Sequence, residues 1–166
     1  MPITPPLFIG RFQPFHRGHL DVVKQILGRH KKIIIGIGSS QHSGTPENPF
    51  SGEMRARMIQ NSLRDEGIGK QRFTIIQIPD INNDDKWVAH VEAIAPAFAA
   101  IYSGTPKVQA LFEKDGKHKV QSPKFNLLIS GTEVREKMAR GQPWEDLVPP
   151  AVVKIIKNHA NQSNHF

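Results

Sequence analysis

The sequence predicts an α/β protein with a doubly wound, Rossmann-like open parallel sheet of about five strands and helices on both faces. Short apolar runs that end at glycine or proline alternate along the chain with segments whose apolar residues recur every three or four positions. One run, Ile33–Ile37, has almost no polar interruption, which is typical of a strand covered on both faces. We expect one domain over residues 1–160 and a polar tail at 161–166.

Strands and helices alternate in the first half of the chain. The segment behind the first apolar run is a loop, because Pro14 forbids an uninterrupted helix there. Residues 39–50 are rich in Ser, Gly, Pro and Asn and form a loop longer than most connections, which favours a function for it. The elements expected here are a strand at 7–10, a helix from Gly18 to Gly28, a strand at 32–38, a helix from about Ser51 to Gly67 and a strand at 73–78.

The second half continues the alternation. The elements expected here are a helix that starts near Trp87 and is closed by Pro96, a strand at 99–103, a short strand at 118–121, a helix from Gly131 to about Arg140 and a helix from Pro150 to about His159. Lys107, Lys114, Lys117 and Lys119 are interpreted as a solvated face. Because parallel strands end at one edge of a sheet, the loops after Gly10, Gly38, Ile78 and Ser103 should share one face.

Composition limits the class of partner and the kind of chemistry. The net charge of +7 favours anionic partners such as phosphate esters. The absence of cysteine excludes disulfides, thiolate metal sites and a cysteine nucleophile. The opening residues do not resemble a signal peptide, and the longest later apolar stretch, Ala93–Tyr102, is about half of what a bilayer crossing requires. We therefore expect a cytoplasmic protein with no membrane partner.

The loop after the first strand is dense in hydrogen-bond donors. Its sequence, GRFQPFHRGH at residues 10–19, contains two arginines and two histidines and leads into a helix. A helix N-terminus adds free N–H groups and a positive dipole end, so this loop can hold a polyphosphate. Gly18 would let the phosphate approach the backbone. The alternative is that His16 is a solvated loop residue and His19 a capping residue, whereas a metal site lacks further ligands at suitable spacing.

A second cluster, ISGTEVREKM at residues 129–138, also leads from a loop into a helix. Ser130 or Thr132 suits the helix cap, and Arg135 lies one turn inside, where it can reach an anion. By itself, this cluster is interpreted as an ordinary capped surface helix, and it indicates a binding site only when it is paired with the first cluster. Other phosphate motifs are missing: the chain has no P-loop, and Gly36-Ile37-Gly38 lacks the third glycine of the dinucleotide fingerprint.

The two clusters, about 110 residues apart, resemble the two signatures of the nucleotidyltransferase superfamily, whose first motif is His/Thr-x-Gly-His. More narrowly, the chain resembles the archaeal-type nicotinamide-nucleotide adenylyltransferases, small enzymes that make NAD from nicotinamide mononucleotide and ATP. Similar residues also occur at Asn48-Pro49-Phe50, Trp87-Val88, Tyr102-Ser103-Gly104 and Trp144 with Leu147-Val148-Pro149. The resemblance therefore covers most of the chain.

The resemblance implies a role for each matching residue, with ATP and nicotinamide mononucleotide as substrates and Mg²⁺ held mainly through the ATP phosphates. The implied catalytic residues are Arg11, His16, His19 and Arg135. The implied ATP-binding residues are Gly10, Phe12, Gly18, Ser130, Gly131 and Thr132. The implied mononucleotide-binding residues are Ile81, Asp84 and Trp87, with Trp87 against the nicotinamide ring, although an ordinary core position is the alternative for Trp87. No protein metal site is expected.

The resemblance implies an asparagine near the carboxamide, in the polar loop before the tryptophan. This chain has Asp84 at that position and so departs from the family pattern. A carboxylate accepts an amide N–H but repels the carboxylate of nicotinate, so we predict a preference for nicotinamide mononucleotide over the acid form. The alternative is that Asp84 points to solvent in a loop with Asn82, Asn83 and Asp85.

The expected reaction is an in-line attack of the mononucleotide 5′-phosphate on the α-phosphorus of ATP with loss of pyrophosphate, in which positioning and charge stabilisation suffice. The rival functions are a related nucleotidyltransferase that accepts phosphopantetheine, flavin mononucleotide or a phosphosugar alcohol, a non-catalytic nucleotide sensor, and a nucleic-acid-binding module. One Tyr and two Trp, with Arg and His gathered in two loops, argue against nucleic acid. A homo-oligomer is expected because similar enzymes form oligomers.

Overall fold

The computed structural model describes residues 4–163, which form one parallel sheet and its covering helices. The strands are β1 (Leu7–Gly10), β2 (Ile33–Gly38), β3 (Phe73–Ile78), β4 (Ala100–Tyr102) and β5 (Lys119–Gln121). The helices are α1 (Arg17–Leu27), α2 (Gly52–Asp65), α3 (Asp84–Ile94), α4 (Pro106–Asp115), α5 (Gly131–Ala139) and α6 (Pro150–Ser163). The five strands have the order β3-β2-β1-β4-β5, so the expected doubly wound sheet is confirmed.

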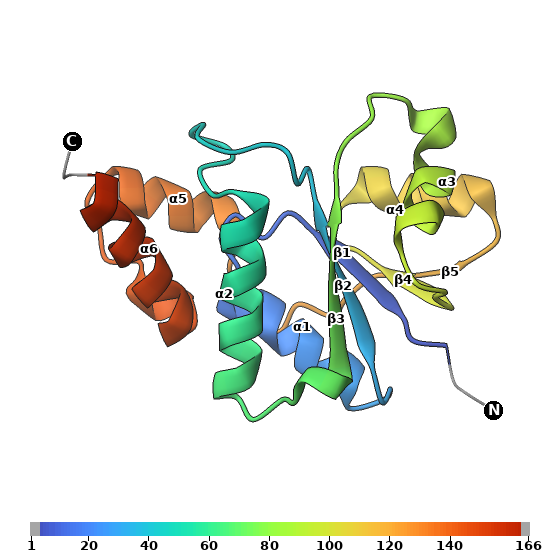
Figure 1. Ribbon diagram of the computed structural model, residues 1–166, viewed down its shortest axis with the longest axis horizontal. Coiled ribbons are helices and arrows are strands. Elements are labelled where there is room, and N and C mark those ends of the chain that lie inside the picture. Colours follow the sequence, from blue (N-terminus) through green and yellow to red (C-terminus); the bar gives the residue numbers. More distant parts are fainter. Residues whose placement is uncertain (1–3, 164–166) are drawn as a thin grey trace.

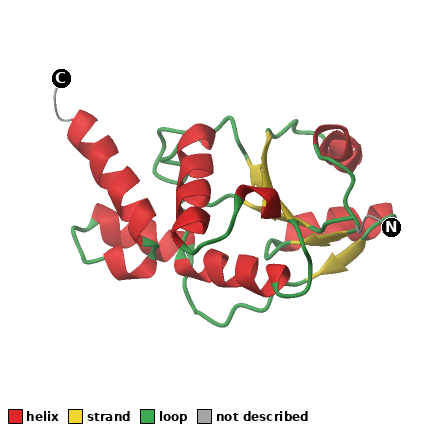
Figure 2. Ribbon diagram, turned by 60° about the horizontal axis from the view of Figure 1, so that its bottom comes forward, coloured by secondary structure: helices red, strands yellow, loops and turns green. Residues whose placement is uncertain are grey.

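Helices cover both faces of the sheet (Figures 1 and 2). Helices α1, α2, α5 and α6 contribute to one buried cluster, whereas α3 and α4 contribute to a second cluster on the other face. The apolar run of β2 is divided between the two clusters, because successive side chains of a strand point to opposite faces. Ile33 and Ile35 belong to the first cluster and Ile34 to the second. The continuous apolar run therefore marks a central strand, as expected.

The carboxyl ends of the strands lie along one edge. In the strand register, Gly10 pairs with Ile37 and Gly38 pairs with Ile78, and β4 runs parallel to β1 on its other side. The order reverses between β1 and β4, because the chain reaches β4 only after it has completed β3 at the far edge. In sheets of this kind ligands bind in the crevice at such a switch point. The expected common face of the four loops is confirmed.

Helix α4 is the main element that the sequence interpretation missed. Pro106 occupies the first turn, the apolar Val108, Leu111 and Phe112 follow at helical spacing, and Gly116 ends the helix with a φ of +77°. Interpreting the lysines of this segment as a solvated face hid the pattern. Phe112 is in fact completely buried in the second cluster.

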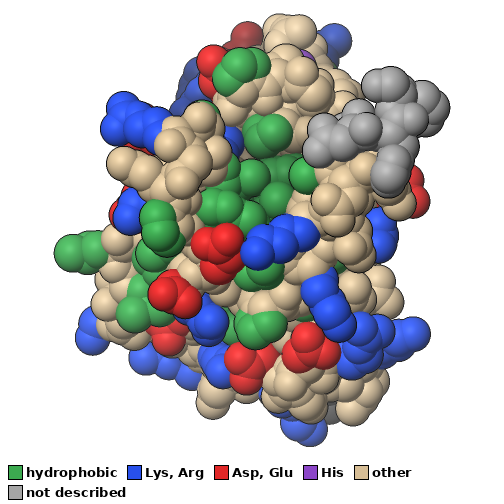
Figure 3. Space-filling model, turned by 90° about the vertical axis from the view of Figure 1, so that its left-hand side faces the viewer, with side chains coloured by type: hydrophobic (Ala, Val, Ile, Leu, Met, Phe, Trp, Pro, Cys, Tyr) green, Lys and Arg blue, Asp and Glu red, His purple; other side chains and the backbone are tan. Residues whose placement is uncertain are grey.

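The last helix extends beyond its expected end. Helix α6 continues to Ser163 instead of ending near His159, so residues 161–163 of the expected tail are helical. Residues 164–166 of that tail lie outside the described residues. Within residues 4–163, no helix combines the length and apolarity that a membrane crossing needs. On the side of the molecule where α5 and α6 lie, apolar side chains gather in a hollow, and charged side chains lie below it in the view of Figure 3.

Candidate active site

Two adjoining cavities open at the carboxyl edge of the sheet. The tryptophan cavity, of about 340 Å³, is lined by residues from the ends of β1, β2 and β3 and from α3 and α4, among them Trp87. The histidine cavity, of about 480 Å³, is lined by residues of both sequence clusters, among them His16 and His19. The residues common to both cavities are Ile9, Gly10, Arg11 and Thr105. The end of β1 and the segment before α4 therefore form a wall between them, at the switch point.

The structure brings the two sequence clusters to one place. His16 and His19 line the histidine cavity together with Ser130, Gly131 and Thr132. Arg135 joins the two clusters directly through hydrogen bonds. Its Nη1 donates to the carbonyl oxygen of Gln13 at 2.8 Å, and its Nη2 donates to the Thr132 hydroxyl at 3.2 Å. Arg135 itself lines neither cavity, so its proposed contact with ATP remains a prediction.

His16 and His19 hold each other in a fixed arrangement at the N-terminus of α1. The backbone N–H of His19 donates to Nδ1 of His16 at 3.3 Å, and the backbone N–H of His16 donates to Nδ1 of His19 at 3.1 Å. The two rings stack with centroids 3.6 Å apart. Because each Nδ1 accepts a hydrogen bond, each neutral ring carries its proton on Nε2. The capping arrangement thus fixes both tautomers as Nε2–H donors.

Both histidines are neutral at physiological pH in this structure. Burial lowers the pKa of His16 to about 4. Burial, and secondarily the neighbouring charge on His16, lower the pKa of His19 well below its usual value. The apolar surroundings of the loop disfavour the charged form of both side chains, so each is a neutral hydrogen-bond donor. Positive charge near the cavity comes from the arginines and the helix N-terminus instead.

Gly18 and Gly131 are required by the packing of the functional side chains. A Cβ atom on Gly18 would lie 2.9 Å from Cε1 of His16, so any other residue would displace the imidazole ring. A Cβ atom on Gly131 would lie 2.8 Å from Nη1 of Arg135 and 3.2 Å from the Gln13 carbonyl oxygen. Each glycine therefore leaves room for a neighbouring side chain, a reason that the sequence did not suggest for Gly18.

Phe12 packs in the core against His19 and does not line either cavity. Its side chain is 1% exposed, lines neither cavity and meets the ring of His19 edge-on, with centroids 4.8 Å apart. The aromatic ring belongs to the core, so ATP binding by Phe12 stays a prediction for its backbone. Gly10, in contrast, lines both cavities.

Arg11 and Arg135 form a positively charged region outside the ion pairs of the described residues. The ion pairs of residues 4–163 include neither guanidinium. Arg11 is exposed, and its Nη1 donates to Oδ1 of Asn48 at 3.3 Å. Burial and the nearby charge of Arg11 lower the pKa of Arg135. The carboxylates of Glu47 and Glu136 act on Arg135 in the opposite direction, but neither forms an ion pair with it. Two neighbouring guanidinium groups outside the ion pairs of residues 4–163 favour an anionic ligand.

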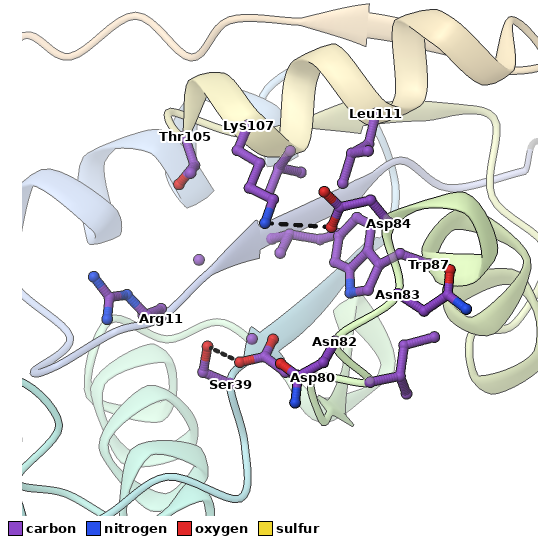
Figure 4. Close-up of a pocket in the computed structure, with 15 residues that line it drawn as sticks. Arg11, Ser39, Asp80, Asn82, Asn83, Asp84, Trp87, Thr105, Lys107 and Leu111 are labelled. Atoms are coloured by element: carbon purple, nitrogen blue, oxygen red, sulfur yellow. Dashed lines mark hydrogen bonds and ion pairs between the residues drawn. The ribbon is translucent and has the colours of Figure 1, made fainter.

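The tryptophan cavity contains all three residues that the resemblance assigned to the mononucleotide, namely Ile81, Asp84 and Trp87 (Figure 4). Trp87 also meets Phe112 edge-on, with centroids 5.8 Å apart, so the indole is both a cavity wall and a core contact. Asp84 does not simply point to solvent. Its Oδ1 pairs with Nζ of Lys107 at 3.3 Å.

The cavity-lining residues that sequence reasoning missed include Ser39, Asp80, Thr105 and Lys107. Ser39 donates its hydroxyl proton to Oδ2 of Asp80 at 2.8 Å. The first three of the missed residues come one to three positions after β2, β3 and β4, so the rule that ligands bind at the carboxyl ends of strands could have found them. Lys107 gave no comparable signal, because helix α4 was not recognised.

Arg55 holds the loops that form the site. Its side chain is 0% exposed, and it donates only to carbonyl oxygens. Nη1 donates to Arg11 at 2.9 Å and to Gly38 at 3.0 Å. Nη2 donates to Ser39 at 3.2 Å, to Ser40 at 3.4 Å and to His42 at 3.2 Å. Burial, with the charge of Arg11, lowers the pKa of Arg55 to about 10, so the group stays cationic near neutral pH.

Comparison with known proteins agrees with this geometry. The cytidylyltransferase-like family model matches residues 7–137. A nicotinamide-nucleotide adenylyltransferase of Thermoplasma acidophilum is 47% identical over 150 residues, which cover 89% of this chain and 82% of that protein. One of Pyrococcus horikoshii is 42% identical over 152 residues, which cover 91% of this chain and 81% of that protein.

Solved structures show the same fold. A bifunctional NMN adenylyltransferase/ADP ribose pyrophosphatase from Francisella tularensis, complexed with AMP and a manganese ion, superposes with a TM-score of 0.73 at 29% identity. The match covers 88% of this chain and 44% of that protein, so the chain spans less than half of the bifunctional protein.

The fold and the paired motifs define a nucleotidyltransferase, whose two cavities lie at the switch point of a parallel sheet. The chain belongs to the cytidylyltransferase-like family and, within it, groups with the nicotinamide-nucleotide adenylyltransferases.

Proposed function

We propose that this chain transfers the adenylyl group of ATP to nicotinamide mononucleotide, giving NAD and pyrophosphate. One observation carries the proposal: the two signature loops meet at one cavity, and that cavity shares Arg11 with a second cavity that contains Trp87. A reaction that joins two nucleotides needs two such neighbouring sites. The names of the relatives support the same activity.

Each substrate has a place in this arrangement. The ATP phosphates occupy the histidine cavity, between the N-terminus of α1 and the Ser130 loop. The mononucleotide occupies the tryptophan cavity, with the nicotinamide ring against Trp87 and beside Ile81, and the carboxamide at Asp84. Its 5′-phosphate then faces the wall at Arg11, which both cavities share.

The chemistry follows from the donors around this wall. A 5′-phosphate oxygen of the mononucleotide attacks the α-phosphorus of ATP, a new P–O bond forms, and the bond to the β-phosphate oxygen breaks. His16 and His19 donate their Nε2 protons as hydrogen bonds to phosphate oxygens, while Arg11 and Arg135 stabilise the negative charge of the transition state and of pyrophosphate. The backbone at Gly10, Gly18 and Gly131, with the hydroxyls of Ser130 and Thr132, positions the triphosphate.

A divalent metal fits this site through its substrate. No cluster of three metal-binding side chains occurs within residues 4–163, and no carboxylate lines the histidine cavity. Phosphate oxygens would thus supply most ligands of Mg²⁺, which on binding offsets the charge of the phosphates. The solved relative contains a manganese ion, so the identity of the metal as Mg²⁺ is part of the proposal.

The direct test is incubation of the purified protein with Mg²⁺, ATP and nicotinamide mononucleotide, followed by detection of NAD and pyrophosphate. Parallel reactions with phosphopantetheine, flavin mononucleotide and a phosphosugar alcohol test the related nucleotidyltransferases. Salt-dependent binding of random DNA without pyrophosphate release would instead favour the nucleic-acid-binding alternative. We expect product with nicotinamide mononucleotide only. The absence of NAD would refute the proposal.

Two further expectations from the sequence stay predictions. A homo-oligomer would be detected as a molar mass above 18.6 kDa in light scattering, and the apolar hollow on the α5 and α6 side is a surface that a second copy would cover. The cytoplasmic location also remains untested.

A further inference from the structure

An ion pair crosses the tryptophan cavity where the nicotinamide ring is placed. Asp84 is the first residue of α3 and Lys107 the second residue of α4, and their charged atoms lie 3.3 Å apart above Trp87 (Figure 4). The two side chains are 59% and 70% exposed, so the pair stands at the open side of the cavity. Both groups are therefore accessible to a ligand and can move to meet it.

The position of Lys107 is not explained by the stability of its helix. The N-terminus of a helix is the positive end of its dipole, so a cation in the first turn is unfavourable there. Asp84, in contrast, is an anion at the start of α3, where the positive end of the helix dipole stabilises it. A surface ion pair of this exposure also contributes little to stability. The lysine thus stands where it weakens its own helix slightly but changes the charge of the cavity.

Among the charged side chains that line the tryptophan cavity, Lys107 is the ion-pair partner of Asp84. The charged side chains of the lining are Arg11, Asp80, Asp84 and Lys107. Asp80 is engaged by the Ser39 hydroxyl at 2.8 Å and by Nε2 of His42 at 3.4 Å. Among the ion pairs of residues 4–163, the pair with Lys107 is the only one that includes Asp84. Asp84 is thus not the isolated carboxylate that its sequence position suggests.

We propose that Lys107, paired with Asp84, determines how strongly this site discriminates nicotinamide from nicotinate mononucleotide. This proposal rests on the proposed function. For the amide form, Asp84 accepts an N–H of the carboxamide and Nζ of Lys107 donates to its carbonyl oxygen. For the acid form, Asp84 repels the carboxylate while Lys107 attracts it. The site therefore prefers the amide by a margin that Lys107 limits.

The test is the ratio of kcat/KM for the amide form to kcat/KM for the acid form, measured with purified full-length variants. Lys107→Met removes the attraction for nicotinate, so we expect the ratio to rise about threefold to tenfold, mainly through a higher KM for the acid form. Asp84→Asn removes the repulsion, so the ratio should fall by a similar factor. In the double variant the two changes should offset each other, and the ratio should return towards that of the unchanged protein.

Lys114→Met is the matched control. Lys114 lies two turns further along α4 and pairs with Asp85 at 3.9 Å, but neither residue lines the cavity. This variant loses the same charge from the same helix, so its ratio should equal that of the unchanged protein. A Lys107→Met ratio equal to that of Lys114→Met overturns the inference, as does a ratio that falls.

The two proposals fail in different ways. If the unchanged protein forms neither NAD nor its acid analogue, the proposed function fails before any ratio is measured. If it forms product and the ratio does not respond to Lys107, only the role of Lys107 fails. Isothermal titration of the two mononucleotides gives a readout without turnover, in which the dissociation constant of the acid form should increase in Lys107→Met.

Discussion

The two histidines of the first loop act as a preformed pair of hydrogen-bond donors. The backbone and ring bonds between His16 and His19 fix both imidazoles before any nucleotide arrives. Because burial keeps both rings neutral, each Nδ1 can accept its capping bond while the Nε2–H group remains available to a phosphate. In the proposed function, the site would stabilise charge by donors that are already oriented, which carries no reorganisation cost at the moment of reaction.

His19→Ala should lower turnover by roughly 10²–10³, the usual effect of removing one transition-state donor. The measurement is the rate of pyrophosphate release at saturating substrates. His30→Ala is a suitable control, since His30 lies before β2, at the opposite end of the strands. Full activity of His19→Ala would remove this residue from the catalytic set.

Arg55→Lys should destabilise the protein by about 2–4 kcal/mol, because an ammonium group cannot reach all the carbonyl oxygens that the buried guanidinium satisfies. We also expect a higher KM for both substrates, since Arg55 holds the carbonyl groups of Arg11 and Gly38 at the edge of the site. Urea denaturation and steady-state kinetics measure the two effects.

Arg57→Lys provides the comparison for this variant. Arg57 is exposed on the same helix, so this substitution should change the free energy of unfolding by no more than about 0.5 kcal/mol. Equal unfolding free energies for the two variants would show that the carbonyl contacts of Arg55 contribute nothing.

At the scale of secondary structure, the N-terminus of α5 has a structural role in the helix cap and, in the proposed function, a role in binding ATP. The Ser130 side chain accepts the backbone N–H of Glu133 at 3.1 Å, which leaves its hydroxyl proton available for a phosphate. Ser51 caps α2 in the same way, accepting from Met54 at 3.1 Å, but does not line either cavity.

Ser130→Ala and Ser51→Ala should each cost about 1 kcal/mol of stability, because each loses one helix cap. Only Ser130→Ala should raise the KM for ATP, by roughly tenfold, the value of one hydrogen bond to a charged group. Thermal or urea unfolding measures the first effect and steady-state kinetics the second. An equal KM in both variants would exclude Ser130 from ATP binding.

The sequence determined the sheet well because central parallel strands are recognisable without tertiary information. The isoleucine run of β2 and the glycine or proline that ends each strand were sufficient to place the sheet. Helix α4 was missed because its apolar face is narrow, and lysines between the apolar residues obscured it. The same omission hid the contact between Lys107 and Asp84, which depends on two helices meeting in space.

The candidate site was only partly predictable for a similar reason. His16, His19 and Ser130 stand in continuous motifs, and the structure places them at one cavity. Arg55 stands in no such motif, because its role comes from carbonyl groups that folding brings around it. One sign was available: Arg55 lies on the apolar face of α2 with Met58 and Ile59, where a charged residue needs an explanation.

At the scale of the whole molecule, the buried histidines make stability depend on pH. The pKa of His16 is about 4 in the folded chain and near 6.5 when unfolded. Between these values the unfolded chain binds a proton that the folded chain does not, so acid favours unfolding. Stability is complete above about pH 6.5 and should fall by roughly 2 kcal/mol between pH 6.5 and pH 5 for this one group.

His16→Asn isolates that contribution. Asparagine accepts the capping hydrogen bond but does not titrate, so the variant should lose less stability on acidification than the unchanged protein. Urea denaturation at pH 7.5, 6.5 and 5 gives the comparison. If the free energy of unfolding falls by the same amount with pH in both proteins, the folded and unfolded pKa values of His16 are equal.

The wall between the two cavities has a consequence for how a catalytic cycle ends. In the proposed function, each starting nucleotide occupies one of the two cavities that share Arg11, whereas the joined dinucleotide spans both. Its two halves are covalently linked. When one half dissociates from its cavity, the other half remains bound and keeps the dissociated half at a high effective concentration near its site. The dinucleotide should thus dissociate more slowly than either starting nucleotide, and its departure rather than bond formation should set the pace of the enzyme.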